Sequence, residues 1–278
     1  MPIIPVYQTC VIAKYGNVDV AWLIAVDRIK KGIEKIMPGF IDILVKHKVI
    51  LAGGAIGSAL RGETPADYDF YIPDVETLGN LLNQNCFRQD RTFIFETKES
   101  AYFKEVYKSD SAITYQSTLG GPRIQIIHNP KMIGPIQEII NKFDFTICMA
   151  AYDLNENIYF VRDYLTDNIS KRLVFNINTP YPISSLFRVQ KYIKKGFRLG
   201  GLDAVKMALR INNINLSDHN ELKDQLQGVD TLLLKDLVDK LGEYKKANDS
   251  YEFKTFIEFA NTWFMEKIYG LVDDKENE

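Results

Sequence analysis

The most restrictive feature of the sequence is a short unit, residues 49–72, in which two strand-like runs enclose two glycines. The run VILA favours a strand and stops at Gly53 and Gly54, and the run YDFYI, closed by Pro73, favours another strand. A strand, a double glycine, a short helix start and a turn therefore precede YDFYI within about fifteen residues. This spacing favours a compact α/β unit.

Helical and strand-like patterns alternate on both sides of this unit up to about residue 178. Residues 18–46 show helical spacing that Pro38 divides in two, and a helix is expected over 75–82. AITYQS and RIQII, separated by residues 118–122, predict a hairpin. MIGPIQEIINKF predicts a helix, and DFTICMAAYD and NIYFVRD predict two further strands.

Beyond about Pro182 helical spacing dominates. We therefore predict an α/β (α+β) fold with two domains: a small mixed-sheet domain over residues 1–178 and an all-helical region over 179–278. The C-terminal run FIEFANTWFMEKIYGL is amphipathic and predicts a packing helix, although the same face could bind a partner.

The composition excludes several classes of protein. The chain has 278 residues, 46% hydrophobic and 25% charged, with a net charge of -2. A chain of this length buries roughly 75% of its extended surface, so it needs no disulfide or metal to hold a core. The mild acidity argues against a surface that coats nucleic acid throughout, but leaves room for a local basic patch.

The cysteines, the histidines and the N-terminus indicate an intracellular protein. Cys10, Cys86 and Cys148 are odd in number and widely spaced, which supports neither a disulfide framework nor a zinc knuckle, and the three histidines are equally scattered. The N-terminus does not resemble a signal peptide, and no apolar run approaches the roughly 18 residues that span a bilayer. We expect a cytoplasmic protein with no membrane association.

Two aspartates in the second strand of this unit are the strongest candidates for chemistry. Asp67 and Asp69 lie two apart, so their side chains leave the same face, whereas Tyr68 and Phe70 point to the other. Two adjacent carboxylates repel unless a cation lies between them, and such hard oxygen ligands suit magnesium. A lone D-x-D pair is more often merely solvated, but the double glycine before it favours a metal site.

The glycines themselves predict a phosphate contact. Gly53 and Gly54 let the backbone approach a ligand closely, a helix starting near Ala55 would direct free N–H groups at a phosphate, and Ser58 could add a hydroxyl. The alternative is a tight turn without a ligand. GGAIGSALRG matches neither a Walker loop nor the dinucleotide fingerprint.

The stretch GGAIGSALRGETPADYDFYI resembles the DNA polymerase β-like nucleotidyltransferase superfamily. It is most similar to the head domain of bacterial-type tRNA CCA-adding enzymes and poly(A) polymerases, with the pattern GGxVRDxLLGRxPxDxD. KFDFTICMAAYD resembles that family's RRDFTINALAYD segment, and LFRVQKYIKKGFRL is more weakly similar to its neck-helix run LRAIRFAAKLGF. These segments frame about residues 48–200.

The sequence also departs from the family pattern. The family's Arg-Asp after the glycines is Gly57-Ser58 here, and its paired arginines before DFT are Lys142-Phe143. The base-selecting EDxxR element should fall near residues 180–184, where the chain has Pro180, Tyr181 and Ser184. These differences argue against specific CCA addition but leave the nucleotidyl-transfer core.

The resemblance implies two magnesium ions, or manganese in their place, bridged by Asp67 and Asp69, with a third carboxylate from a neighbouring strand. The strand RIQII offers only Gln125, so Asp144, which is expected to begin the next strand, is the candidate. The family pattern gives the equivalent aspartate a competing role at the nucleotide ribose. A solvated aspartate at a strand start is the third alternative.

A basic helix is expected over residues 184–199, with positive side chains on one face and apolar ones on the other. The basic residues are Arg188, Lys191, Lys195 and Arg198, and the apolar residues are Leu186, Val189 and Ile193. Arg188, Lys191 and Lys195 could grip a triphosphate or an RNA backbone, although many charged helix faces are only solvated.

We therefore predict a magnesium-dependent nucleotidyltransferase that moves NMP from an NTP to a hydroxyl at an RNA 3' end, of tRNA or another RNA. One alternative is a protein or small-molecule acceptor, as in toxin-like or antibiotic-modifying members of the superfamily. Another is an inactive homologue that binds nucleotide or RNA. The sequence indicates neither the NTP nor the oligomeric state.

Overall fold

The computed structural model describes most of the chain and divides it into two compact units. The described residues are 10–13, 20–36, 39–82, 92–94, 102–117, 120–154, 157–216, 218–226, 238–240, 242–243, 258 and 262. The first unit comprises residues 1–180 and 189–207, and the second comprises 181–188 and 208–278. The predicted boundary near residue 178 lies beside the first of these divisions, but the chain returns to the first unit afterwards.

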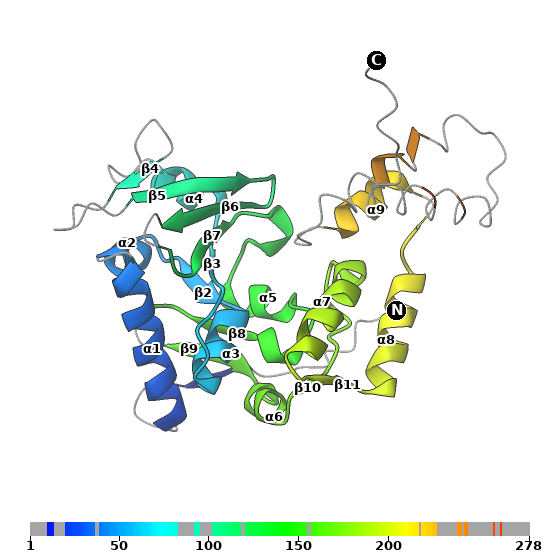
Figure 1. The fold of residues 1–278 in the computed structure, drawn as a ribbon, viewed down its shortest axis with the longest axis horizontal. Helices are drawn as coiled ribbons and strands as arrows, with labels where there is room; N and C mark the ends of the chain where they lie inside the picture. The colour runs from blue at the N-terminus through cyan, green and yellow to red at the C-terminus, as the bar shows by residue number, and fades with distance from the viewer. Residues whose placement is uncertain are drawn as a thin grey trace, which may run out of the picture. The chain divides into compact units, whose positions relative to one another are not determined.

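The first unit is built on one mixed sheet, to which the described residues contribute nine strands (Figure 1). The order is β1–β9–β8–β2–β3–β7–β6–β5–β4. β3 and β7 pair in parallel, and the other neighbours are antiparallel. The bounds are β1 Cys10–Ala13, β2 Ile50–Ala52, β3 Asp67–Tyr71, β4 Thr92–Ile94, β5 Tyr102–Lys108, β6 Ala112–Ser117, β7 Arg123–Ile127, β8 Ala150–Tyr152 and β9 Ile158–Val161.

The predicted mixed α/β fold and the β6–β7 hairpin are confirmed, but the sheet is larger than the small one predicted. β5 accounts for part of the difference. Its sequence, YFKEVYK, mixes charged and apolar residues without the strict alternation that predicts a strand. The alternation is interrupted where the strand has a bulge, between Glu105 and Tyr107.

Helices accompany the sheet, and most begin and end where the sequence punctuation predicts. The α-helices are α1 Val20–Ile36, α2 Phe40–Lys46, α3 Gly54–Arg61, α4 Val75–Leu82, α5 Ile136–Asn141, α6 Tyr164–Ile169, α7 Pro182–Lys194, α8 Gly201–Asn212 and α9 His219–Gln225. The 3₁₀ turns are η2 Pro130–Met132 and η3 Thr146–Cys148, and β10 Arg172–Leu173 pairs in parallel with β11 Arg198–Leu199. None of the helices within these ranges is long and apolar enough to cross a membrane.

One face of β3 packs into the hydrophobic core. Tyr68 and Phe70 are buried, and the Phe70 ring meets Phe40 of α2 edge to face, with centroids 5.7 Å apart. Gly32 of α1 leaves no room for a Cβ because the Tyr68 hydroxyl lies against it. The core therefore fixes this strand by its aromatic face and leaves its other face for polar side chains.

Two sequence predictions need correction. DFTICMAAYD is not one strand, because β8 covers only Ala150–Tyr152 and residues 146–148 form η3. Thr146 instead donates its backbone N–H to the Val174 carbonyl and its hydroxyl to Asp167, which connects the segment to α6 and to the chain that follows it. All ten residues from 143 to 152 are buried, so the run has no periodicity that could reveal the turn.

The helix expected over 184–199 ends at Lys194. Gly196 has φ 83°, a left-handed conformation that terminates the helix, and the chain continues into β11. In the second unit, α9 starts at a capped position, where the Asp218 side chain accepts hydrogen bonds from the N–H groups of residues 220 and 221. The predicted packing helix at residues 256–271 lies outside the described residues apart from residues 258 and 262.

Candidate functional site

The acidic pair lies on the polar face of β3, in the middle of the sheet. Asp67 and Asp69 are half-buried, and they alternate with the buried Tyr68 and Phe70 as the spacing predicts. In the parallel register with β7, Asp67 lies beside Arg123 and Asp69 beside Gln125. The carboxylates therefore have a cation and an amide as neighbours on the same face.

The glycine turn adjoins this pair through the register of β2 and β3. Ile50 pairs with Tyr71 and Leu51 with Phe70. One further step of the same antiparallel register sets Ala52, the last residue of β2, beside Asp69, and the double glycine follows Ala52 directly. The structure thus brings the double glycine and the two aspartates together.

The N-terminus of α3 is suited to an anion. No side chain caps it, and its first turn contains no acidic residue. The first N–H groups of such a helix carry a partial positive charge. Gly53 has φ 85° and donates its own N–H to the Ala150 carbonyl, whereas Gly54, the first residue of α3, is exposed. A Cβ on Gly54 would meet open space.

Phe143 borders the site where the family pattern has an arginine. Its ring meets Tyr71 edge to face with centroids 5.5 Å apart, and it lies 3.8 Å from where a Cβ on Gly53 would be. Asn176 holds this segment by donating its side-chain N–H groups to the carbonyls of Asn141 and Phe143. An apolar wall therefore stands at the place where sequence resemblance predicts positive charge.

Asp144 follows this wall and is buried, with 1% of its surface exposed. Its carbonyl accepts a hydrogen bond from the Asn176 N–H. It does not begin a strand, because η3 separates it from β8. Across the described part of the chain, no three His, Cys, Asp or Glu residues gather as a metal-binding group, so Asp144 is not assembled with Asp67 and Asp69 into such a set.

The acidic pair alone has the chemistry of a magnesium site. Oδ1 of Asp69 is inaccessible to solvent, whereas both residues as a whole are half-buried. Magnesium is commonly held by one or two carboxylates, with waters and substrate phosphates completing its shell. Two carboxylates on one face, beside a helix N-terminus that favours phosphate, meet that requirement.

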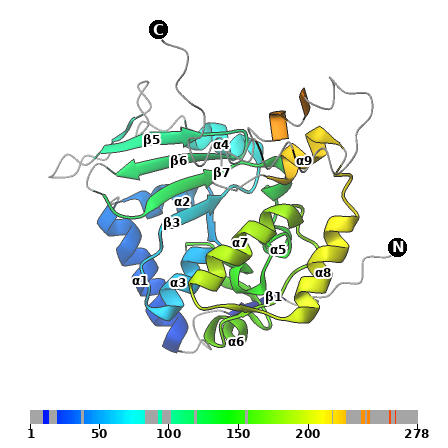
Figure 2. The same ribbon diagram turned by 45° about the vertical axis from the view of Figure 1, so that its right-hand side comes forward.

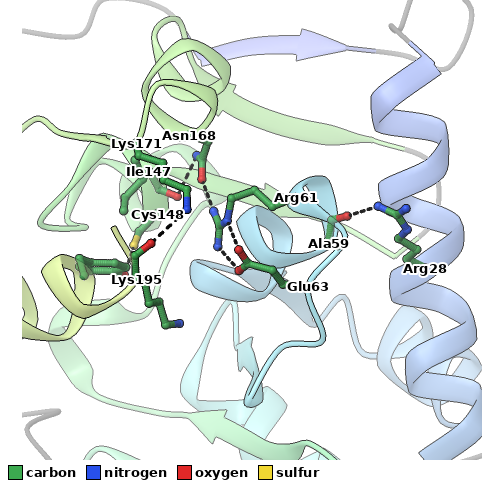
Figure 3. Close-up of polar contacts among 10 residues, drawn as sticks. Arg28, Ala59, Arg61, Glu63, Ile147, Cys148, Asn168, Lys171 and Lys195 are labelled. Carbon is green, nitrogen blue, oxygen red and sulfur yellow. Dashed lines mark hydrogen bonds and ion pairs between the residues drawn. The ribbon is translucent and has the colours of Figure 1, made fainter. Parts of the chain in front are cut away.

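Two arginines fix the opposite end of α3 (Figure 3). Arg28 of α1 donates to the carbonyl of Ala59 at 2.9 Å, which satisfies a carbonyl in the last turn. Arg61 donates to the Asn168 side chain at 2.7 Å and to both carboxylate oxygens of Glu63. Its guanidinium also lies 5.3 Å from the centre of the Phe197 ring.

Gly57 is the position at which the family pattern has an arginine. A Cβ there would lie 2.9 Å from Asn168 Oδ1 and 3.1 Å from Arg61 Nη1. Arg61, one turn later, therefore fills the space that a side chain at position 57 would need. Ser58, predicted to contact the nucleotide, is 6% exposed within α3.

The predicted basic helix face is only partly present. Lys191 is exposed, Arg188 is half-buried and assigned to the second unit, and Lys195 lies just past the end of α7. Leu186 and Ile193, predicted to lie on the apolar face, are 46% and 54% exposed. The helix therefore does not divide into one basic and one buried face.

Lys195 does not belong to a basic face of α7, and it adds positive charge near Arg61 and Glu63. Its carbonyl accepts a hydrogen bond from Lys171 Nζ (Figure 3). Hydrogen bonds from Arg61 hold the pKa of Glu63 below its ordinary value, and the charges of Arg61, Lys195 and Lys171 act in the same direction. The Glu63 carboxyl therefore ionises more readily than an ordinary glutamate.

Sequence reasoning missed Arg123, Arg61 and Asn168. Arg123 begins the predicted strand RIQII, two residues before Gln125, so the alternation of that strand alone would have placed both on one face. The Arg61–Asn168 contact joins residues 107 positions apart, and no local pattern signals it.

The fold and this site define a mixed α/β protein in which an acidic pair on a central strand adjoins the uncapped start of a helix. Residues 26–171, just over half of the chain, match the model of the Gabija anti-defense 2 family. The chain belongs to the Gabija anti-defense 2 family.

The sequence identity to individual proteins is low. The chain is 28% identical over 235 residues to "Gabija anti-defense 2" of Bacillus phage SPbetaL7, covering 79% of this chain and 54% of that protein. It therefore spans about half the length of this curated relative. Among solved structures, it is similar to the Thermotoga maritima CCA-adding enzyme complexed with tRNA, with 15% identity and a TM-score of 0.48, covering 95% of this chain and 64% of that one. A CCA-adding enzyme with CTP has 16% identity and a TM-score of 0.45, covering 88% and 62%.

Proposed function

We propose that the chain is a magnesium-dependent nucleotidyltransferase that moves NMP from an NTP to a hydroxyl group. The observation that carries this proposal is the β2–α3–β3 unit, in which Asp67 and Asp69 share one face of β3 beside the uncapped start of α3. The carboxylates attract divalent cations, and the helix amides attract phosphate. The magnesium complex of a nucleoside triphosphate supplies both the divalent cation for the carboxylates and the phosphate for the helix amides.

In this proposal each part of the site has one task. Asp67 and Asp69 hold the magnesium ions, which supply charge neutralisation on the phosphates and a lower pKa for the attacking hydroxyl. The amides at the start of α3 receive the triphosphate, and Gly54 keeps that approach open. Phe143 and Tyr71 limit water on one side. Asp144 is retained as a contact to the nucleotide ribose, and Ser58, Lys191 and Lys195 as further nucleotide contacts.

The acceptor we propose is an RNA 3' end, as the sequence resemblance predicts. The family to which the chain belongs is named for counteracting the Gabija defence, and we extend that role to this chain. This name favours a second candidate acceptor, a protein of the defence system of the bacterium. Both candidates use the same site and differ only in where the nucleotide is attached.

Labelled transfer separates the candidates. The purified chain is incubated with magnesium and each α-labelled NTP, together with either total RNA or total bacterial protein. We expect pyrophosphate release and label on RNA, and label on protein alone would replace the RNA proposal with the second candidate. No pyrophosphate with any NTP, metal or acceptor would overturn the enzymatic proposal and leave a protein that acts by binding.

A further inference from the structure

The polar face of the sheet continues well beyond the acidic pair. From Asp69 the register passes to Gln125 of β7, then to Thr114 of β6 and then to Tyr107 of β5. Residues paired across neighbouring strands point to the same face. Tyr107 therefore lies on the same face as Asp69, three strands away.

A second row runs beside the first. Asp67 pairs with Arg123, and Gln116 pairs with Lys104. Tyr115 pairs with Ile124, so the next step of that antiparallel register sets Gln116 beside Arg123. The row is thus Asp67, Arg123, Gln116 and Lys104, on strands that lie side by side in Figure 2.

The bulge in β5 brings a ring and a cation onto this face together. Lys104 and Tyr107 are three residues apart, and in a regular strand they would point to opposite faces. The bulge between Glu105 and Tyr107 inserts one extra residue, and both side chains consequently face the same way.

The two faces of these strands differ sharply in chemistry. Ile124 and Ile126 of β7 and Tyr115 of β6 are buried on the core face. On the polar face Arg123 and Lys104 are exposed and Tyr107 is 46% exposed, whereas Thr114 is 3% exposed, so the accessible residues are Arg123, Lys104 and Tyr107 with the half-buried Gln116. Within the two rows just described, Asp67 and Asp69 are the only carboxylates.

We propose that Arg123, Gln116, Lys104 and Tyr107 form a binding surface for a single strand of nucleic acid whose end reaches the acidic pair. Three strand spacings of about 4.8 Å make this row roughly 14 Å long. At about 3.4 Å per stacked nucleotide it accommodates about four nucleotides. Cations with an aromatic platform are the combination that single strands use, through phosphates and through an unstacked base.

The surface binds the strand by its phosphodiester backbone, which RNA and DNA share. The direction, with the free end at Asp67 and Asp69, rests on the proposed function; the binding itself does not. Binding can therefore be measured without NTP or metal, so that a failed surface and a failed enzyme give different results.

The test is fluorescence anisotropy of the full chain with short single-stranded RNA and DNA of mixed sequence over a series of salt concentrations. In Arg123→Ala/Lys104→Ala we expect the slope of log affinity against log salt to fall in magnitude by about 1.4, because each phosphate contact to a single strand contributes about 0.7. Tyr107→Leu should weaken binding about tenfold, and Tyr107→Phe, which keeps the ring, should bind as the unchanged chain does.

The matched control is Lys46→Ala/Arg162→Ala, which removes the same charge from α2 and from the end of β9. The proposal holds if this control variant keeps the original salt slope while the slope of Arg123→Ala/Lys104→Ala falls by about 1.4 in magnitude. It holds whether RNA and DNA bind equally or RNA binds better. Equal losses in both double variants would overturn it, as would binding to neither nucleic acid.

Discussion

The two ends of α3 are built in opposite ways. At the N-terminal end Gly53 and Gly54 carry no side chains, no cap is present, and the acidic pair stands alongside. At the C-terminal end Arg28 donates to the Ala59 carbonyl of α3, and Arg61 donates to the Asn168 side chain of α6 and to the Glu63 carboxylate just beyond α3. Side-chain contacts therefore hold α3 at its C-terminal end. The N-terminal end has no capping side chain, which is the arrangement that the proposed phosphate contact needs.

Replacing the carboxylates should give the largest effect. In the proposed function these carboxylates hold magnesium, so Asp67→Asn or Asp69→Asn is expected to lower nucleotidyl transfer at least about 100-fold. The melting temperature should stay unchanged, since loss of one charge relieves repulsion in the empty site. Pyrophosphate release and thermal melting measure the two quantities. Asp110→Asn, an exposed carboxylate in the turn before β6, serves as the control. A steep fall in melting temperature in the Asp67 or Asp69 variant would make the pair structural.

Breaking the other end of the helix should cost stability instead. Arg61→Leu is expected to lower the free energy of unfolding by about 1–3 kcal/mol, because it removes a donor from the buried Asn168 side chain. Chemical denaturation measures this loss. Glu63→Gln, which changes the exposed partner of Arg61, should cost less than about 1 kcal/mol. Equal losses in the two variants would show that the Asn168 contact is not the important one.

The two glycines should respond differently to the same methyl group. Gly53→Ala is expected to cost about 1–2 kcal/mol of stability, because φ is 85° there. At Gly54 a Cβ meets open space, so Gly54→Ala should leave stability unchanged and weaken NTP binding by blocking the approach of phosphate. Denaturation and NTP titration separate the two effects. Unchanged NTP affinity in Gly54→Ala would contradict the proposal that the phosphates bind at the start of α3.

The smallest expected effect concerns pH. Burial raises the pKa of Asp167, and hydrogen bonding from Thr146 and the charge of Arg172 oppose the rise. The folded protein therefore holds this proton more tightly than the unfolded chain, so stability falls as pH rises from the ordinary Asp range through the raised pKa. Asp167→Asn should remove this part of the pH dependence in denaturation curves. Asp163→Asn should keep most of it, because burial is the largest cause of the raised pKa and the charge of the exposed Asp163 is a smaller one.

Local signals predicted much of the fold. α1 ends at Ile36 and α2 begins at Phe40, so the two helices lie on either side of Pro38 in the sequence. The expected helix over 75–82 is α4, where the Asp74 side chain accepts a hydrogen bond from the Thr77 N–H. The aspartates alternate with buried aromatic residues as expected. Each of these features depends on residues within one turn or one strand of each other, so the sequence pattern contains the information.

The features that were missed depend on distant residues. Arg123 stands beside Asp67 only because β3 and β7 pair in parallel, and the register of that pairing is not written in either strand. The segment after Asp144 is drawn into a 3₁₀ turn by Thr146 bonds to Val174 and Asp167. The segment is apolar along most of its length, and such a run without periodicity was interpreted as a strand. Its conformation is decided by these tertiary contacts and not by its own pattern.

The parallel β3–β7 pairing has a consequence for motion. β3 has hydrogen-bonded neighbours on both sides, β2 and β7, which come from opposite directions along the chain. Successive amides of such a strand point alternately to the two neighbours, so exchange of the whole strand with deuterium requires both pairings to open, an event close to global unfolding. The two-residue β10–β11 pair can open alone and should exchange far sooner. The strand that carries the acidic pair is thus expected among the slowest-exchanging segments of the molecule.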